Sequence, residues 1–167
     1  MSRFAALAVS LALLSSRAAP AQTKPLPDGF QGLKWRAPVA KGMKLKKDES
    51  FGDNADYRRP SDVRKLHGAV LESITYGFFK GQFCSVTIQT DVGQGAKLLK
   101  ALADEWGPPT KAAENVYVWR DESETLAFFR GTDLHGTSST GELYIVCKPL
   151  VELANKAERE RREKAGR

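Results

Sequence analysis

Two adjacent apolar segments constrain the fold of this chain more than any other feature. Residues 70–79 and 83–90 are rich in β-branched and aromatic side chains, and only a short Lys-Gly-Gln segment separates them. This pattern predicts a β-hairpin in which Gly81 supplies the positive φ of a two-residue turn and Phe79 pairs with Gln82. Strict alternation from that pair predicts two faces: Leu71 and Phe79 with Cys84, Val86 and Ile88 on one, and Val70, Ile74, Tyr76 and Phe78 with Phe83 on the other.

A helix and three further strands follow the hairpin. Apolar residues recur at helical spacing from Leu98 to Trp106, and a Gly-Pro-Pro sequence ends that segment. Strands are predicted at 116–120, 124–130 and 142–148. The order β-β-α-β-β-β predicts an α+β fold, with an antiparallel sheet of about five strands, one amphipathic helix on one face and a charged helix at the C-terminus.

The N-terminus has the three parts of a secretion signal. Arg3 precedes an apolar run from Phe4 to Leu14, and small residues ending at Ala21 form a cleavage site before Gln22. The run is too short to cross a membrane, which takes about 18 apolar residues or more. We therefore expect the signal peptide to be removed and the protein to act in the periplasm or outside the cell, with no transmembrane segment in the mature chain.

The chain divides into four expected regions. These are the signal peptide at 1–21, an extended lead-in at 22–31, a single α+β domain at 32–154 and a charged, partly disordered helical tail at 155–167. The length that remains after the signal fits one domain. Residues 39–69 show no clear pattern, and the sequence does not predict their structure. Between Val39 and Arg59, charged residues and the turn-like Gly-Asp-Asn at 52–54 fit either irregular structure or a short edge strand.

The charge of the chain is mildly basic. It carries 26 basic and 20 acidic side chains, a net charge of +6, which does not indicate a nucleic-acid-binding protein. Such an excess can bind an anionic surface of the cell envelope, or it can simply form solvated faces. The basic residues are concentrated in three clusters: Lys41, Lys44, Lys46 and Lys47; Arg58, Arg59, Arg64 and Lys65; and the C-terminal tail.

The two cysteines, Cys84 and Cys147, both lie within predicted strands. Outside the cytoplasm, cysteines on neighbouring strands can form a disulfide. They can equally stay reduced and pack as small apolar side chains, and the sequence leaves both possibilities open. His67 and His135 show no paired ligand spacing with the cysteines, so no metal site is predicted.

No catalytic motif stands out. Asp133 and His135 lie in a Gly-, Thr- and Ser-rich loop at 131–141, but the chain has no Gly-x-Ser-x-Gly elbow. The glycines that precede the helix fit neither the dinucleotide fingerprint nor the phosphate-binding loop. We therefore predict no catalytic residue and no cofactor, and a protein that is not an enzyme.

A five-stranded sheet with one helix leaves its second face to be covered. Residues 32–35 and the start of the C-terminal helix can supply that cover. Otherwise the face binds a partner, because a large exposed apolar patch marks a binding site. The candidate surface residues are Phe79, Tyr117, Trp119, Phe129 and Tyr144, with Asp133 and His135 in the neighbouring loop.

Five short motifs lie along the chain: GLKW at 32–35, YGFFKGQF at 76–83, LADEWGPP at 102–109, YVW at 117–119 and ELYI at 142–145. Together they resemble a group of small exported bacterial α+β proteins of uncharacterised function. That group has a Gly-x-x-Trp start, an aromatic hairpin, a helix ending in Trp-Gly-x-Pro and a Trp-bearing strand, although Arg36 stands here where glycine is expected. The resemblance implies export and an α+β fold, and no catalytic residue.

These observations favour an exported, non-enzymatic envelope protein that binds a protein or an anionic envelope component. Two alternatives remain. One is a secreted inhibitor that presents the loop at 131–141, and the other is a small hydrolase that uses His135. The sequence identifies neither the partner nor the oligomeric state.

Overall fold

The computed structural model describes residues 24–46, 52–135 and 138–165. The predicted signal peptide lies outside the described residues. In chain order the elements are β1 (Gly29–Phe30), β2 (Leu33–Lys34), β3 (Lys44–Leu45), β4 (Asn54–Arg58), β5 (Lys65–Leu66), β6 (Ala69–Phe79), β7 (Gln82–Thr90), α1 (Gly95–Trp106), β8 (Thr110–Ala113), β9 (Val116–Arg120), β10 (Thr125–Thr132), β11 (Thr140–Cys147) and α2 (Lys148–Ala165).

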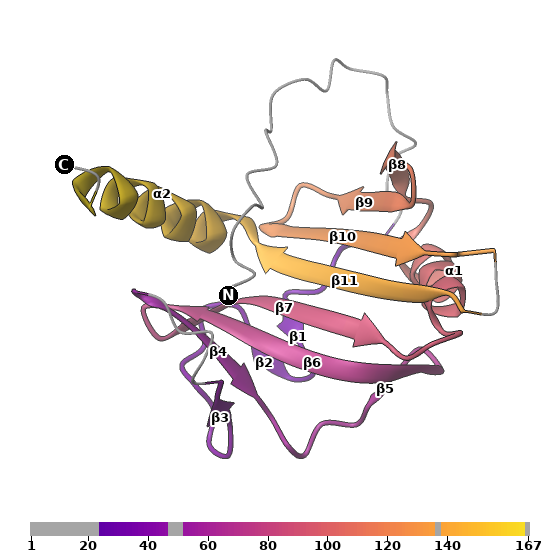
Figure 1. Cartoon of the computed structure of the whole chain (residues 1–167), viewed down its shortest axis with the longest axis horizontal. Coiled ribbons are helices and arrows are strands. Elements are labelled where there is room, and N and C mark those ends of the chain that lie inside the picture. Colours follow the sequence, from indigo (N-terminus) through magenta and orange to yellow (C-terminus); the bar gives the residue numbers. More distant parts are fainter. Residues whose placement is uncertain (1–23, 47–51, 136–137, 166–167) are drawn as a thin grey trace.

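The predicted α+β class with a mostly antiparallel sheet and two helices is confirmed (Figure 1). The main sheet is larger than predicted, because it contains nine of the eleven strands in the described residues rather than about five, while β1 and β2 form a separate two-stranded sheet. The strand order of the main sheet is β3-β4-β6-β7-β11-β10-β9-β8, with β5 paired to β6 beside this path. The additional strands of this sheet are short and extend it at its two ends, as β3 and β4 beside β6 and as β8 beside β9, while β5 pairs with the start of β6. An edge offers free backbone partners, so a segment can pair there without an apolar alternating pattern.

The hairpin between β6 and β7 has the predicted turn but not the predicted faces. Phe79 pairs with Gln82, and Lys80 and Gly81 have φ values of 50° and 74°. Phe78 then pairs with Phe83, but Gly77 pairs with Ser85, so Cys84 is the extra residue of a β-bulge.

The bulge shifts the alternation of β7 by one residue. Tyr76 therefore pairs with Val86, and Ile74 pairs with Ile88, on one buried face. Strict alternation placed these residues on opposite faces, which is wrong. Gly77 permits the close approach at the bulge, since a Cβ there would overlap the Ser85 hydroxyl.

The main core lies on one face of the sheet, where α1 and the N-terminal segment both pack. Leu98 and Leu102 of α1 are fully buried there, and the Trp106 ring meets the Trp119 ring edge to face, with centroids 5.6 Å apart. Trp35 stacks on Phe83 at 4.8 Å, and β1 and β2 lie behind the sheet in Figure 1. Residues 32–35 therefore cover the same face as α1, and not the second face.

Helix α2 packs at one end of the sheet and then extends away from it (Figure 1). Leu150 and Ala154 are buried against Phe79, Cys84 and Cys147. The rest of α2 is mostly charged and exposed. No helix within the described ranges is both long and apolar enough to span a membrane.

Candidate functional site on the open sheet face

The face of the sheet opposite α1, called here the open face, holds the candidate site. No described helix or strand lies in front of its central strands in Figure 1. Thr87 of β7 pairs with Tyr144 of β11, which pairs with Phe128 of β10, which pairs with Val118 of β9. Side chains directly opposite one another on antiparallel strands point to the same face. These residues therefore form one row across the open face, and each is half-buried.

An aromatic stack lies at the centre of this row. The rings of Phe128 and Tyr144 are nearly parallel, at 14°, with centroids 4.5 Å apart. Tyr144 was among the predicted surface residues, but Phe128 was not. Alternation places Phe128 on the face opposite Ala127 and Phe129, but it does not show which of the two faces is covered, and Phe129 was predicted at the surface instead.

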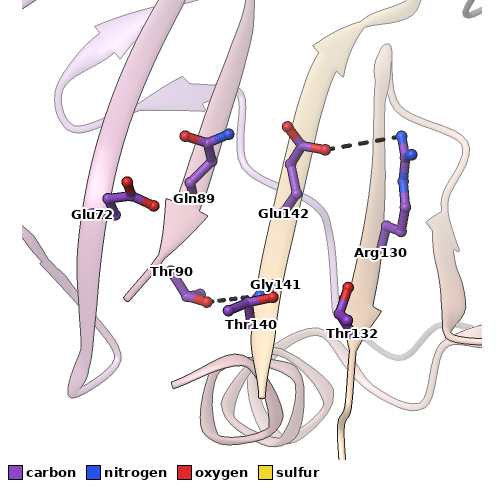
Figure 2. Close-up of a pocket in the computed structure, with 8 residues that line it drawn as sticks. All are labelled: Glu72, Gln89, Thr90, Arg130, Thr132, Thr140, Gly141 and Glu142. Carbon is purple, nitrogen blue, oxygen red and sulfur yellow. Dashed lines mark hydrogen bonds and ion pairs between the residues drawn. The ribbon is translucent and has the colours of Figure 1, made fainter. Parts of the chain in front are cut away.

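A polar hollow of about 340 Å³ lies beside the stack (Figure 2). Its charged and amide side chains come from four neighbouring strands, and most of the remaining lining residues are threonines. Thr90 is buried, and its hydroxyl accepts a hydrogen bond from the Gly141 amide at 2.7 Å. The full lining is Glu72, Gln89, Thr90, Arg130, Thr132, Thr140, Gly141 and Glu142.

Three side chains join the hollow to the stack. Arg130 and Glu142 are directly opposite in the β10–β11 register, and their charged groups are 3.9 Å apart. Tyr144 hydrogen bonds to both, and burial followed by the bond to Glu142 raises the pKa of its phenol. The phenol therefore stays protonated at neutral pH. Arg130, Glu142 and Tyr144 are called the open triad below.

Two cations extend the row toward the β3–β4 edge. Lys44 and Arg58 pair directly across these strands, and both are exposed. Tyr57 packs on Phe78 in the core, so its neighbour Arg58 points to the open face. Within the part of the chain that the structure describes, neither cation has an acidic partner. Lys44 and Arg58 are called the cationic edge below.

A second Arg–carboxylate–Tyr group, the closed triad, lies on the core side. Arg59 Nε donates to Asp62 Oδ1 at 2.5 Å, and the Tyr76 hydroxyl donates to Asp62 Oδ2 at 2.7 Å. Arg59 Nη2 also donates to the Tyr76 oxygen at 3.1 Å. Arg59 is therefore committed to the fold, although its sequence neighbours form a basic cluster.

The other predicted surface aromatics are not exposed on the open face. Trp119 and Phe129 are fully buried in the main core, and Phe79 is buried beside α2. Tyr117 is half-buried against the main core. They were predicted as surface residues because the alternation of a strand does not reveal which face is covered.

The loop at 131–141 does not bring Asp133 and His135 together into a reactive pair. Asp133 accepts a hydrogen bond from Ser138, and Leu134 is buried against Gly131. His135 is exposed and has no hydrogen-bond partner among the described residues. In the part of the chain that the structure describes, no group of His, Cys, Asp and Glu side chains could bind a metal ion.

Both cysteines are buried free thiols. They lie in the small cluster at the base of α2. Burial raises the pKa of Cys84 to about 11 and also raises the pKa of Cys147. Thiolate, the nucleophilic form, is therefore scarce in the folded protein at neutral pH.

Comparisons of the chain with known protein families, with curated proteins and with solved structures found no match. The function therefore has to be inferred from the geometry of the open face.

Proposed function

We propose that this protein is an exported, non-enzymatic binding module that holds an anionic polysaccharide of the cell envelope on its open face. One observation carries the proposal. The cationic edge, the aromatic stack and the polar hollow lie on one face of the sheet, and no described helix or strand lies in front of the central strands of this face in Figure 1. Export is supported by the order of charged, apolar and small residues in the first 21 positions.

The hollow has the chemistry to bind hydroxyl groups. Glu142 and Glu72 accept hydrogen bonds, Arg130 donates them, and Gln89 and the threonines do both. The Arg130–Glu142 pair is long, at 3.9 Å, and partly exposed, so a ligand can insert between its groups at little cost. The edges of the Phe128–Tyr144 stack provide apolar area for the C–H groups of a sugar ring.

The cationic edge accounts for the anionic part of the ligand. Like charges directly opposite each other on paired strands destabilise a sheet. Lys44 and Arg58 stand in that relation, and a bound carboxylate or phosphate would offset their repulsion. Their field would also attract an anionic polymer from a distance, by an amount that falls as salt rises.

The polar character of the face favours a polysaccharide over a protein partner. The centre of a protein interface is depleted of charged residues, whereas the open triad places two charges beside the aromatic stack. The exposed large apolar residues are scattered over separate elements: Val39, Leu45, Val63, Val70, Val92 and Leu153. They do not form the continuous patch that marks a protein-binding surface.

Calorimetric titration with a soluble polyuronate, with neutral dextran as the control polymer, tests this function. We expect the polyuronate to bind and the dextran to bind at least about tenfold more weakly at low salt, because only the polyuronate can pair with cations. The double variant Lys44→Gln/Arg58→Gln should lose about tenfold in polyuronate affinity.

A matched double variant keeps the total charge equal. Lys111→Gln/Lys164→Gln removes two exposed cations that are not part of the row. Lys111 pairs with Tyr117, which packs on the core side, and Lys164 lies in the last turn of α2. This variant should lose less than about twofold in affinity. Equal losses in the two double variants would show non-specific attraction and refute the proposed site. Capture of a protein partner through the open face, with no polyuronate binding, would refute the proposed ligand.

A further inference from the structure

The β7–β11 register ends one residue before the two cysteines. Val86 pairs with Ile145, and Ser85 pairs with Val146. One further step along both strands brings Cys84 to Cys147. Residues directly opposite on antiparallel strands have Cα atoms about 4.5–5.5 Å apart, which lies within the range of about 4.4–6.8 Å found for disulfides.

The surroundings bring the two side chains into one small space. Cys84 and Cys147 are both buried in the cluster that contains Phe79, Leu150 and Ala154. Cys84 is the extra residue of the β6–β7 bulge, and such a bulge can turn a side chain away from strict alternation. Cys147 is the last residue of β11, directly before α2. A bond between them would fix the start of α2 to β7.

We infer that Cys84 and Cys147 are a site of covalent cross-linking and form an intramolecular disulfide when the chain folds in an oxidising compartment. The oxidant is an external disulfide, either of a protein or of a small thiol such as glutathione. One cysteine thiolate attacks it to form a mixed disulfide, and the second thiolate displaces the external thiol. The two cysteines lose two protons in total, and the oxidant leaves as two thiols.

The reaction belongs to an early stage of folding. In the folded protein both thiols are buried, where an external disulfide cannot reach them, and thiolate is disfavoured there. The thiols are accessible only before α2 docks on Phe79 and Cys84. A chain that folds in reducing conditions therefore traps two free thiols, and a chain that folds in oxidising conditions traps the disulfide.

Refolding of the full chain from denaturant tests the inference. In a glutathione redox buffer, the monomer should lose the mass of two hydrogen atoms, and peptide mapping without reductant should recover the peptides of Cys84 and Cys147 joined. The oxidised form should melt about 10 °C above the reduced form, since a cross-link over a loop this long limits the unfolded chain. Reduced protein that is already folded should oxidise much more slowly than the unfolded chain.

The controls separate the cross-link from the packing of the cluster. Cys84→Ser, Cys147→Ser and Cys84→Ala/Cys147→Ala should each melt at the same temperature with and without oxidant. If a variant does not fold, the comparison of oxidised and reduced wild-type protein still decides the question. A wild-type monomer that refolds in oxidant with both thiols free, or an oxidised form less stable than the reduced form, would overturn the inference. Polyuronate binding is independent of this result, because the open triad and the cationic edge do not include either cysteine.

Discussion

The closed and open triads contain the same three chemical groups in two different environments. In the closed triad the Arg59–Asp62 contact is 2.5 Å long and the side chains are 21% and 6% exposed. In the open triad the Arg130–Glu142 contact is 3.9 Å long and the side chains are 52% and 28% exposed. Solvent access therefore separates a structural role from a role in binding, even though the residue types are the same.

Solvation explains the difference. A buried charge without its partner keeps the full cost of lost hydration, so a buried pair must stay together. A partly exposed pair gains little from its own contact, because water and salt screen it. The closed triad can thus stabilise the loop that contains Arg59 and Asp62, while the open triad can exchange its internal contact for contacts with a ligand.

The two triads should differ most in how much stability the protein loses when the carboxylate charge of each triad is removed. Asp62→Asn removes the carboxylate charge and replaces one of its two acceptor oxygens with an NH2 donor, so either Arg59 or the Tyr76 hydroxyl loses its acceptor. We expect this change to lower the free energy of unfolding by about 3 kcal/mol. Glu142→Gln should change it by less than about 0.5 kcal/mol. Urea denaturation of both variants measures these values, and equal losses would contradict the distinction between the triads.

The bulge that places Tyr76 and Tyr144 on opposite faces can be tested at Gly77. A Cβ at this position would overlap the Ser85 hydroxyl, so Gly77→Ala should cost about 2 kcal/mol of stability. The double variant Gly77→Ala/Ser85→Ala should recover most of that loss in the same denaturation experiment, because the overlapping atom is gone. A Gly77→Ala protein as stable as the wild type would show that the bulge does not depend on this close approach.

For ligand affinity, in contrast to stability, substitutions in the open triad should have larger effects than substitutions in the closed triad. Arg130→Gln and Glu142→Gln each remove hydrogen-bonding capacity from the hollow, and we expect each to lower polyuronate affinity about fivefold. Tyr76→Phe removes a hydroxyl from the closed triad and should leave the affinity of the folded protein unchanged within about twofold. Calorimetry at a temperature where every variant is folded makes the comparison. Loss of affinity in Tyr76→Phe alone would place the site on the core side.

A smaller difference is expected in how much Tyr76 and Tyr144 each contribute to the loss of stability at alkaline pH. Burial raises the pKa of both Tyr76 and Tyr144 above the value of an unfolded tyrosine. A raised pKa contributes stability that is complete below the unfolded value of about 10 and is lost as the pH rises toward the folded value. Tyr76→Phe should flatten this alkaline loss more than Tyr144→Phe, since Tyr76 is fully buried. Denaturation at several pH values from about 8 to 11 measures it, and an unchanged alkaline slope in both variants would contradict the assignment.

Local patterns predicted the centre of the fold well. The turn at Lys80 and Gly81, helix α1 and the central strands all follow from short-range alternation, helical spacing and turn residues. The bulge at Cys84 could not be predicted from such patterns, because one extra residue in a continuous apolar run leaves no local signal. Strand β8 was also not predicted, and a short edge strand was only one of two alternatives for the segment that contains β4. Both strands form by pairing with an edge of the sheet.

The candidate site was predicted only in part. Tyr144 was identified, but its partners Phe128, Arg130 and Glu142 were not. Their relation depends on the pairing of β10 with β11, in which Arg130 meets Glu142 and Phe128 meets Tyr144. Such cross-strand pairs depend on register, and a long loop separates these strands in the sequence.

The central claim is that the open face is the ligand-binding surface, and two-dimensional NMR of the amide groups tests it most directly. During titration with polyuronate, we expect the largest shift changes at Arg58, Thr87, Phe128, Arg130 and Glu142, and small changes in α1. The changes should weaken as salt is added, because part of the attraction is electrostatic. Changes confined to the charged turns of α2, or spread evenly over every basic segment, would contradict the account.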